Sequence, residues 1–300
     1  MSTVEDATTV AVPPSKPPRV IRRTSASFPV RKIGNDYRDV GAKADALIPG
    51  QPMIAQLFCG ISMFFPPGER FMIAAAKSIQ DQVQDPKLRA DIDAFARQEA
   101  QHASEHSRAN RVLAAQAGWD SDKVCREINA IWLFIEKHCS PRVRAGFTAA
   151  TEHFTAIISE ILLTDLEFVD AVPESKGKQM LLWHAIEECE HKAVVFDAYK
   201  EVGGSELERL AIMAVYTVPV FVAAMFPFIR LVIGHGHGTD LKGWAKGFAT
   251  FGRRWGLPFA TKYLRYYQPG FHPDHLPTGH LEQYWIKKLG VIDDGKKTTA

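Results

Sequence analysis

Residues 85–118 read DPKLRADIDAFARQEAQHASEHSRANRVLAAQAG, and both ends of this stretch have the signals of a helix boundary. Asp85 is a favoured helix-capping residue, and Pro86 fits the first helical position, where its missing N–H is not needed. Gly118 is the residue type that most often follows the end of a helix, because it adopts positive φ without strain. The stretch therefore predicts one long helix that runs to about Ala117.

Similar boundary signals recur on both sides of this stretch. They predict helices from about Glu69 to Val83 after Pro66-Pro67-Gly68, from Ser121 to about His138, from Ser140-Pro141 to about Phe168, from Pro173 to about Val202, and after a Ser205 cap. Strand signals are nearly absent, because the Val and Ile residues fall at helical spacing and no alternating run is bounded by turns. The sequence therefore predicts an all-α fold.

The chain divides into three parts. Residues 1–48 are rich in Pro, Ser, Thr and Arg and lack helical or strand periodicity, which indicates a disordered N-terminal arm. Residues 49–204 contain the predicted helical bundle. Residues 205–300 contain the apolar helix, in which Leu210 to Ile229 has no charged residue, and then an aromatic and basic extension. We expect this part to pack on the bundle, although about 20 apolar residues are also enough to contact or cross a bilayer.

Composition excludes several classes of protein. The chain has 300 residues, of which 46% are hydrophobic and 23% charged, and these values are typical of a folded globular protein. The formal net charge is only +2, so no basic excess favours nucleic acid as a partner. The cysteines at positions 59, 125, 139 and 189 form no Cys-x-x-Cys pair, and we interpret them as reduced thiols. With no signal peptide visible from Met1 to Val10, the sequence predicts a cytoplasmic protein that could associate with membranes.

Two Glu-x-x-His pairs lie within predicted helices. They are Glu99 with His102, and Glu188 with His191. At this spacing both side chains project from one helix face, about 4.5 Å apart along the axis, so they can bind one metal ion together. A single pair arises easily by chance, because Glu and His are common residues. A lone Glu is also more often a solvated charge on the helix surface. Two pairs on separate helices are more specific for a metal site.

Two further glutamates complete the set of metal-binding residues. Glu69 is expected at the start of its helix, and Glu152 inside a later one. One Glu from each of two helices, together with Glu-x-x-His from each of two others, is the ligand set of carboxylate-bridged di-metal bundles. Four carboxylates balance two divalent cations, which makes burial of the site tolerable. Glu160 and Glu167 are alternatives to Glu152, which we prefer because small residues surround it.

Four stretches contain these residues: FPPGER (65–70), RQEAQH (97–102), TEHFT (151–155) and WHAIEECEHK (183–192). In these stretches the chain resembles the ferritin-like di-iron carboxylate proteins, and more closely the bacterial family of predicted metal-dependent hydrolases. The resemblance extends from roughly Arg31 to Gly290. It implies a ferritin-like four-helix bundle with two metal ions, additional C-terminal helices, and Ser121 to His138 as the crossover helix.

His184 adds a third histidine to the site. His184, Glu188 and His191 occupy positions i, i+4 and i+7, which form one helical stripe. This His-x-x-x-Glu-x-x-His spacing resembles the extra-histidine di-iron site of arylamine N-oxygenases. The resemblance implies that His184 is a seventh ligand, and a histidine of the core is the alternative.

Four other side chains adjoin the predicted ligands. We expect His106 to lie behind the ligands or to line a pocket, because it is about 10 Å along the helix axis from Glu99. His153 points about 100° away from Glu152 around the helix, which favours a structural or hydrogen-bonding role. Glu187 and Glu190 are expected to face outward or to support the ligands from behind.

The predicted ligand set limits the possible reactions. Glu and His ligands suit iron or manganese, with zinc possible, and iron is the commonest metal in such bundles. Two ferrous ions can together give two electrons to O2, which favours a di-iron oxygenase or oxidase of a hydrophobic small molecule, served by an external electron donor. Leu210 to Ile229 would supply a substrate pocket or membrane access. The alternatives are metal-dependent hydrolysis of an ester or phosphoester, and non-enzymatic iron binding with ferroxidase activity.

Overall fold

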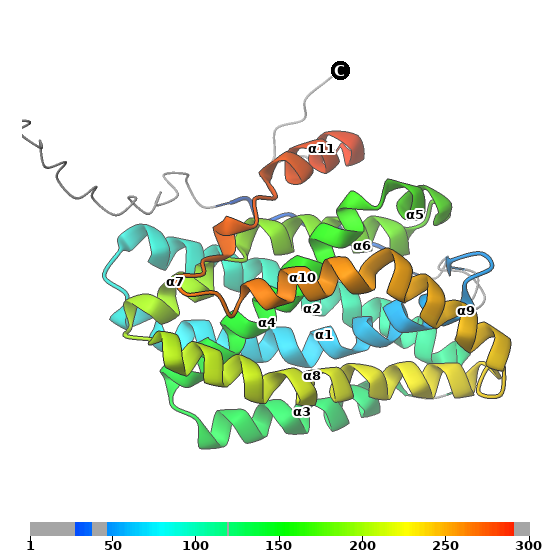
Figure 1. Cartoon of the computed structure of the whole chain (residues 1–300), viewed down its shortest axis with the longest axis horizontal. Helices are drawn as coiled ribbons and strands as arrows, with labels where there is room; N and C mark the ends of the chain where they lie inside the picture. Colours follow the sequence, from blue (N-terminus) through cyan, green and yellow to red (C-terminus); the bar gives the residue numbers. More distant parts are fainter. Residues whose placement is uncertain (1–27, 38–46, 119, 291–300) are drawn as a thin grey trace, which may run out of the picture.

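The computed structural model describes residues 28–37, 47–118 and 120–290. Residues 28–37 are not helical, the other two ranges are mainly helical, and the described residues contain no β-strand. Figure 1 shows the arrangement of the helices. They are α1 (Pro52–Ile79), α2 (Pro86–Gln116), α3 (Ser121–His138), α4 (Pro141–Thr164), α5 (Leu166–Ala171), α6 (Lys176–His191), α7 (Val194–Glu201), α8 (Glu206–Gly234), α9 (Leu241–Phe251), α10 (Leu257–Arg265) and α11 (Gly279–Leu289). The all-α prediction is confirmed. Residues 1–27 and 38–46 of the predicted arm lie outside the described residues.

Four helices, α1, α2, α4 and α6, form the central bundle. α1 packs against α2 and α4, and α6 packs against the same two helices from the other side. α3 connects α2 to α4 and packs on α1 and α2, which is the place expected of the crossover helix. Trp132 of α3 is buried, and its ring stacks on Phe71 of α1 with 4.8 Å between ring centroids. The bundle therefore has a continuous apolar core on its α3 side.

The first helix starts earlier than predicted. α1 begins at Pro52 and contains Pro66 and Pro67, so the expectation of a helix start near Glu69 is wrong. Each proline lacks the N–H that would bond to the carbonyl four residues earlier. Side chains of neighbouring helices compensate, because Asn110 Nδ2 donates to the Ser62 carbonyl at 2.8 Å and Cys125 Sγ lies 3.6 Å from the Met63 carbonyl. Tertiary contacts thus allow the helix to continue through two prolines.

Two predicted helices are each divided in two. The helix expected to reach Phe168 ends at Thr164, because the Asp165 side chain accepts the Phe168 N–H at 3.1 Å and so caps the short helix α5. The helix expected from Pro173 starts at Lys176 with Ser175 as its cap. It ends at His191 rather than near Val202, and α7 follows after a turn.

His191 and Lys192 lie at the end of α6, and their side chains point in different directions. The His191 ring faces the centre of the bundle, where its Nε2 is 3.1 Å from Glu99 Oε1. The ammonium group of the next residue, Lys192, donates to Thr278 Oγ1 at 2.8 Å. The end of α6 therefore contacts both the interior of the bundle and the C-terminal segment.

The C-terminal helices cover one side of the bundle. α8 packs on α1 and α4, α9 packs on α1, and α10 packs on α4. Ser205 caps α8 by accepting the Glu208 N–H, as predicted. α8 is the one helix in the described residues that is long and apolar enough to cross a membrane, although 39% of its most apolar window is buried inside the protein.

α1 and α8 approach each other closely at Gly60, which generates a prediction about stability. A Cβ atom at Gly60 would lie 2.7 Å from the Phe228 backbone nitrogen, which is closer than atoms can pack. We expect Gly60→Ala to lower the free energy of unfolding by about 1–3 kcal/mol, despite the better helix propensity of Ala, because α8 must move away. Urea denaturation measures this change. Gly252→Ala is the control, since no atom lies within 4 Å of its Cβ position, and a Gly60→Ala protein as stable as wild type would contradict the prediction.

Candidate metal centre

The seven side chains predicted as metal ligands converge in the middle of the bundle, and each is at most 3% exposed. They are Glu69 on α1, Glu99 and His102 on α2, Glu152 on α4, and His184, Glu188 and His191 on α6. Glu69 lies well inside α1, because that helix begins at Pro52. The alternatives to Glu152 lie elsewhere: Glu160 pairs with Lys262 at 2.7 Å, and the Glu167 side chain is 86% exposed.

The donor atoms of these residues form three overlapping groups, and within each group they lie within 4.8 Å of one another. One end of the cluster has Glu69, His102 and His184, and the other end has Glu99, Glu152 and His191. A third group, of Glu99, His102 and Glu188, connects the two ends. Glu188 lies between the ends, since its Oε1 is 2.8 Å from His184 Nε2 and 3.5 Å from His191 Nε2. A carboxylate in this position could contact metal ions at both ends, and the arrangement has enough ligands to hold metal.

Two histidines are oriented by hydrogen bonds on their outer nitrogens. His102 Nε2 donates to Glu187 Oε2 at 3.0 Å, so Nδ1 is the nitrogen that lies near the carboxylates. His191 Nδ1 lies 2.9 Å from Gln98 Oε1, and that oxygen is the acceptor because Gln98 Nε2 donates to the Pro29 carbonyl. His191 Nε2 is therefore a lone pair that faces Glu99 at 3.1 Å. Such outer partners fix the tautomer of metal-binding histidines.

A chain of hydrogen bonds does the same for His184. Asn110 Oδ1 accepts from Ser62 Oγ at 2.6 Å, so Ser62 Oγ in turn accepts from His106 Nδ1 at 2.8 Å. His106 Nε2 is then the acceptor for His184 Nδ1 at 2.6 Å, and His184 Nε2 is left as a lone pair. That lone pair faces Glu188 Oε1 at 2.8 Å. Two acceptors at this distance repel each other unless a shared cation lies between them.

Nine buried polar atoms of the cluster have no hydrogen-bond partner among the described residues. They are both carboxylate oxygens of Glu69, Glu99 and Glu152, Glu188 Oε2, His102 Nδ1 and His191 Nε2. A buried polar group without a partner costs on the order of 1–3 kcal/mol, so native proteins rarely leave several together. Every one of these atoms is a suitable metal ligand. The residues present therefore fit a pair of bound metal ions.

The electrostatics of the cluster also favour bound positive charge. Burial, together with the charge of Glu99, raises the pKa of Glu69 well above its usual value, and burial does the same for Glu152. Burial opposes the charged form of His102, but the carboxylates of Glu187 and Glu99 outweigh it and raise the pKa of His102 to about 10. Without a metal ion Nδ1 therefore carries a proton, and it becomes a lone pair only when that proton is displaced. Burial also opposes charge on the other two carboxylates, but the nearby histidines outweigh it and lower the pKa of Glu99 and of Glu188. Protons are therefore held by Glu69, Glu152 and His102, whereas Glu99 and Glu188 are charged. Metal ions that bind here would displace these protons.

Sequence reasoning missed the groups that support the ligands from behind. Arg31 is 4% exposed, and its guanidinium donates to Glu187 Oε1 at 3.2 Å and to Glu190 Oε2 at 2.7 Å. Glu187 and Glu190 therefore lie inside the protein, and Glu187 supports His102, whereas an outward orientation is wrong. Gln98, which orients His191, was also missed. Arg31 supports His102 through Glu187, and Gln98 supports His191, but neither lies on the same helix as its histidine. No helical spacing in the sequence could therefore have indicated these two residues.

His106 and His153 have different surroundings. His106 is 1% exposed and lines the cavity beside the cluster, as expected from its position. Burial, with the nearby His184 and His102, holds the pKa of His106 well below its usual value, so the ring is neutral. His153 packs against Tyr266 and Phe271 of the C-terminal segment, and burial lowers its pKa to about 3. Its contacts are those of a structural residue.

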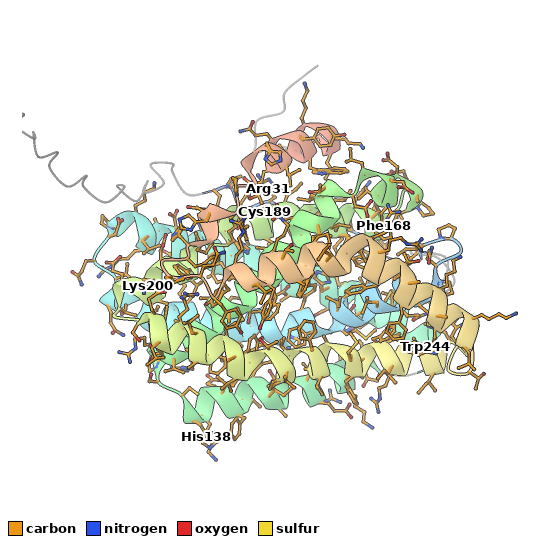
Figure 2. All side chains as sticks on the ribbon, in the orientation of Figure 1. Arg31, His138, Phe168, Cys189, Lys200 and Trp244 are labelled. Atoms are coloured by element: carbon orange, nitrogen blue, oxygen red, sulfur yellow. The ribbon has the colours of Figure 1, made fainter. Side chains whose placement is uncertain are left out.

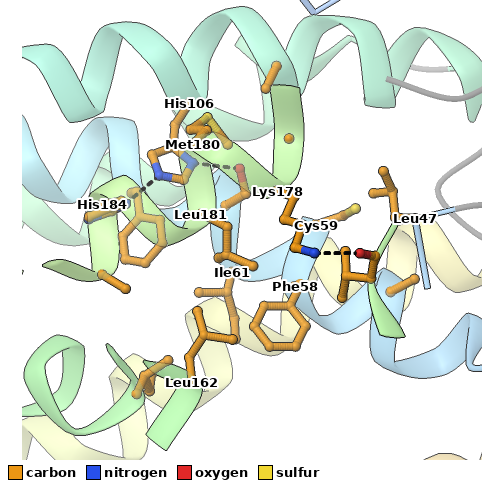
Figure 3. A pocket seen from close by; sticks show the side chains of 18 of the residues that line it. Leu47, Phe58, Cys59, Ile61, His106, Leu162, Lys178, Met180, Leu181 and His184 are labelled. Atoms are coloured by element: carbon orange, nitrogen blue, oxygen red, sulfur yellow. Dashed lines mark hydrogen bonds between the residues drawn. The ribbon is translucent and has the colours of Figure 1, made fainter. Parts of the chain in front are cut away.

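An apolar cavity of about 110 Å³ adjoins the cluster (Figure 3). His184, Glu188 and His106 line it at one end, and most of the remaining lining is hydrophobic. The Phe65 ring lies 4.7 Å from the His184 ring and 4.8 Å from the His106 ring, centroid to centroid. Apart from the carboxylate–histidine cluster, a molecule in this cavity would meet mostly apolar side chains, with Lys178 and a few hydroxyl groups as the polar exceptions.

Fold and geometry together define a helical protein with a buried Glu/His centre able to hold metal. The chain belongs to the family described as predicted metal-dependent hydrolases, whose sequence profile matches residues 30–276. This confirms the family resemblance. No curated protein and no solved structure matches the chain significantly.

The position of Glu188 between the two ends of the cluster generates a prediction about metal content. We expect Glu188→Ala to lose at least one of two bound metal ions per chain, because the shared carboxylate is removed, while helical content stays largely intact. Elemental analysis of the metal-loaded protein and far-ultraviolet circular dichroism measure the two properties. Glu160→Ala, which removes a carboxylate of the same helix bundle outside the cluster, is the control and should keep both ions. Two metal ions per chain in Glu188→Ala would show that the ligand assignment is wrong.

The hydrogen bond from His102 to Glu187 generates a second prediction. Glu187→Gln weakens the acceptor that orients His102, and loss of such a partner commonly lowers metal affinity about 10- to 100-fold. We expect a loss in this range when the apoprotein is titrated with Mn(II) in competition with a chelator. Glu167→Gln is the control, because the Glu167 side chain is exposed and pairs with Arg254, which is not part of the cluster. Equal affinities for Glu187→Gln and wild type would contradict a supporting role for Glu187.

Proposed function

We propose that this protein is a di-iron enzyme that uses O2 to oxidise a hydrophobic small molecule. The observation that carries the proposal is the orientation of three histidines, each of which holds an outer hydrogen bond and aims its inner nitrogen at buried carboxylates. The proposal includes a ferritin-like assignment for the bundle. It also assigns His184 as a ligand, since its lone pair faces Glu188.

Iron is the metal that best fits the donor set. Four carboxylates and three imidazoles are donors of mixed hardness, which suit ferrous iron and manganese better than copper. A pair of ferrous ions supplies the electrons that O2 needs, and this chemistry requires protection from water. A cluster with at most 3% exposure at each residue meets that requirement.

The surroundings of the cluster favour an apolar substrate. Phe65 and Ile61 line the adjacent cavity near His184, and the charged side chains that line it are Glu188 of the cluster and Lys178. The ammonium of Lys178, which also lines the cavity, donates to the Val172 carbonyl at 2.8 Å and to Glu174 at 2.6 Å. A phosphate or carboxylate would therefore have to compete for Lys178, whereas a hydrocarbon would not.

An oxygenase of this kind requires an external electron donor. The four cysteines, Cys59, Cys125, Cys139 and Cys189, are free thiols on different helices or at their ends. They form no metal-binding group with one another. We therefore propose that electrons come from a separate redox protein rather than from a second centre in this chain.

Metal-dependent hydrolysis of an ester is the second candidate, and the family description favours it. Two metal ions at this site would lower the pKa of bound water and polarise a carbonyl. The residues that hold the metal ions would be the same. The two candidates therefore differ in the metal, in the requirement for O2 and in the polarity of the substrate.

Oxygen reactivity of the iron-loaded protein distinguishes the two candidates. We expect the apoprotein, loaded without oxygen with two equivalents of Fe(II), to develop a transient visible absorption after O2 is added and to consume about one O2 per two Fe(II), since each O2 accepts two electrons. Stopped-flow absorption and an oxygen electrode measure this reaction, with zinc-loaded protein as the unreactive control. No O2-dependent change, together with ester hydrolysis by the zinc-loaded or manganese-loaded protein, would overturn the oxygenase proposal in favour of hydrolysis.

A further inference from the structure

α8 leaves one entire side uncovered, and that side is apolar. Its other side packs on α1 and α4. The exposed large side chains along the helix are Leu207, Val215, Val218, Phe221, Val222, Phe226, Ile229 and Ile233. Val218 is 67% and Val222 is 64% exposed, and no charged residue occurs between Leu210 and Ile229. Scattered exposed apolar residues are normal, but a stripe along a 29-residue helix marks an interaction site.

α9 and α10 extend this apolar side and add positive charge. Leu241, Phe248, Leu257 and Leu264 are exposed on these helices. The same stretch, residues 241–265, has six Lys or Arg residues and no Asp or Glu. Arg254 and Lys262 pair with Asp165 and Glu160, so the exposed positive charge is that of Lys242, Lys246, Arg253 and Arg265. Exposed apolar and basic residues on one surface are the signature of helices that lie in the interface of an anionic membrane.

Contacts between the helices make these residues one surface. Thr217 of α8 is hydrogen-bonded to Tyr263 of α10, with 2.8 Å between the hydroxyl oxygens. The Trp244 ring of α9, labelled in Figure 2, packs against Phe228 of α8 at 5.5 Å between centroids. Figure 1 shows α8, α9 and α10 on the same side of the bundle. We call the exposed residues of these three helices the apolar–basic face.

A second cavity opens through this face. It has a volume of about 390 Å³, lies between α1, α4 and the C-terminal helices, and is lined almost wholly by apolar residues. Phe221, Phe248 and Phe251 line it and are also exposed, so they form its rim at the surface. Six of its lining residues also line the cavity at the metal centre: Phe58, Ile61, Phe65, Thr155, Ile158 and Leu162. These shared side chains are the partition between the surface opening and the cluster.

We propose that the apolar–basic face docks on lipid bilayers that contain anionic lipids, with α8 to α10 lying in the interface. Docking places the rim of the larger cavity against the hydrocarbon, so an apolar molecule dissolved in the membrane can enter without crossing water. This entry route rests on the proposed function in one respect, because it assumes that the substrate is apolar. The docking itself is independent of the reaction.

Two features favour a bilayer surface over the other occupants of such a face. A second copy of this chain would place the same basic residues against themselves in a symmetric dimer, and like charges would oppose association. Insertion of α8 across a bilayer would carry α1 and α4, which pack on its other side, into the hydrocarbon, and these helices have exposed charges at Arg70, Lys77 and Arg142. Arg209, near the start of α8, is 1% exposed and lies over the Tyr266 ring at 4.6 Å, which fixes this end to the segment after α10.

Co-sedimentation of the full chain with vesicles tests the docking. We expect binding to vesicles of phosphatidylcholine with phosphatidylserine, and much weaker binding to phosphatidylcholine alone. Val218→Gln with Val222→Gln removes apolar contacts, and Lys242→Glu with Arg253→Glu reverses two charges on the face. Each double variant should bind the anionic vesicles at least about tenfold more weakly. Lys287→Glu with Lys288→Glu makes the same charge change on α11, away from the face, and should bind within about twofold of wild type.

The outcomes separate the docking from its alternatives and from the proposed reaction. All substituted residues are exposed or partly exposed, and circular dichroism with thermal unfolding verifies that each variant is folded. No binding of wild type to anionic vesicles would overturn the proposal, as would equal weakening by the α11 variant. A dimer in analytical ultracentrifugation that Val218→Gln with Val222→Gln dissociates, without vesicle binding, would assign the face to self-association. Vesicle binding needs no metal or turnover, so its failure is distinct from failure of the oxygenase proposal.

Discussion

The burial of four carboxylates in the middle of a helical bundle is the constraint on which the rest of this structure depends. Each buried carboxylate would be costly without a cation or hydrogen bonds, and most of their oxygens have no hydrogen-bond partner among the described residues. The surrounding side chains orient three histidines so that a metal ion could bind between these histidines and the carboxylates. The outer nitrogens of three histidines are held by Glu187, Gln98 and His106, so that the inner nitrogens stay available.

The same constraint explains features far from the cluster. α1 has to continue through Pro66 and Pro67 to place Glu69 opposite His184, and Asn110 compensates for one of the lost backbone hydrogen bonds. Asn110 also accepts from Ser62, which begins the chain of hydrogen bonds that fixes His184. One asparagine therefore contributes to both the continuity of a helix and the orientation of a site residue. A substitution at Asn110 would disturb both.

Local sequence signals predict the helices and the cluster well but do not predict the groups that depend on tertiary contacts. The starts of α2, α4 and α8 follow from Asp85, Ser140 and Ser205, because capping is a local interaction. Glutamate and histidine spacing identifies the residues that converge, since the spacing reflects helix geometry. The start of α1 could not be predicted, because it requires side chains from α2 and α3. Arg31 could not be predicted either, because its partner Glu187 lies 156 residues away in the sequence.

X-ray absorption spectroscopy of the iron-loaded protein tests the proposed di-iron centre most directly. In the proposed centre one iron ion would be held by Glu69, His102 and His184, and the other by Glu99, Glu152 and His191, with Glu188 between them. Such a pair predicts iron–iron scattering at about 3.5–4 Å. The nearest shell should contain only oxygen and nitrogen. An oxygen and nitrogen shell without iron–iron scattering, at two iron ions per chain, would contradict a shared centre.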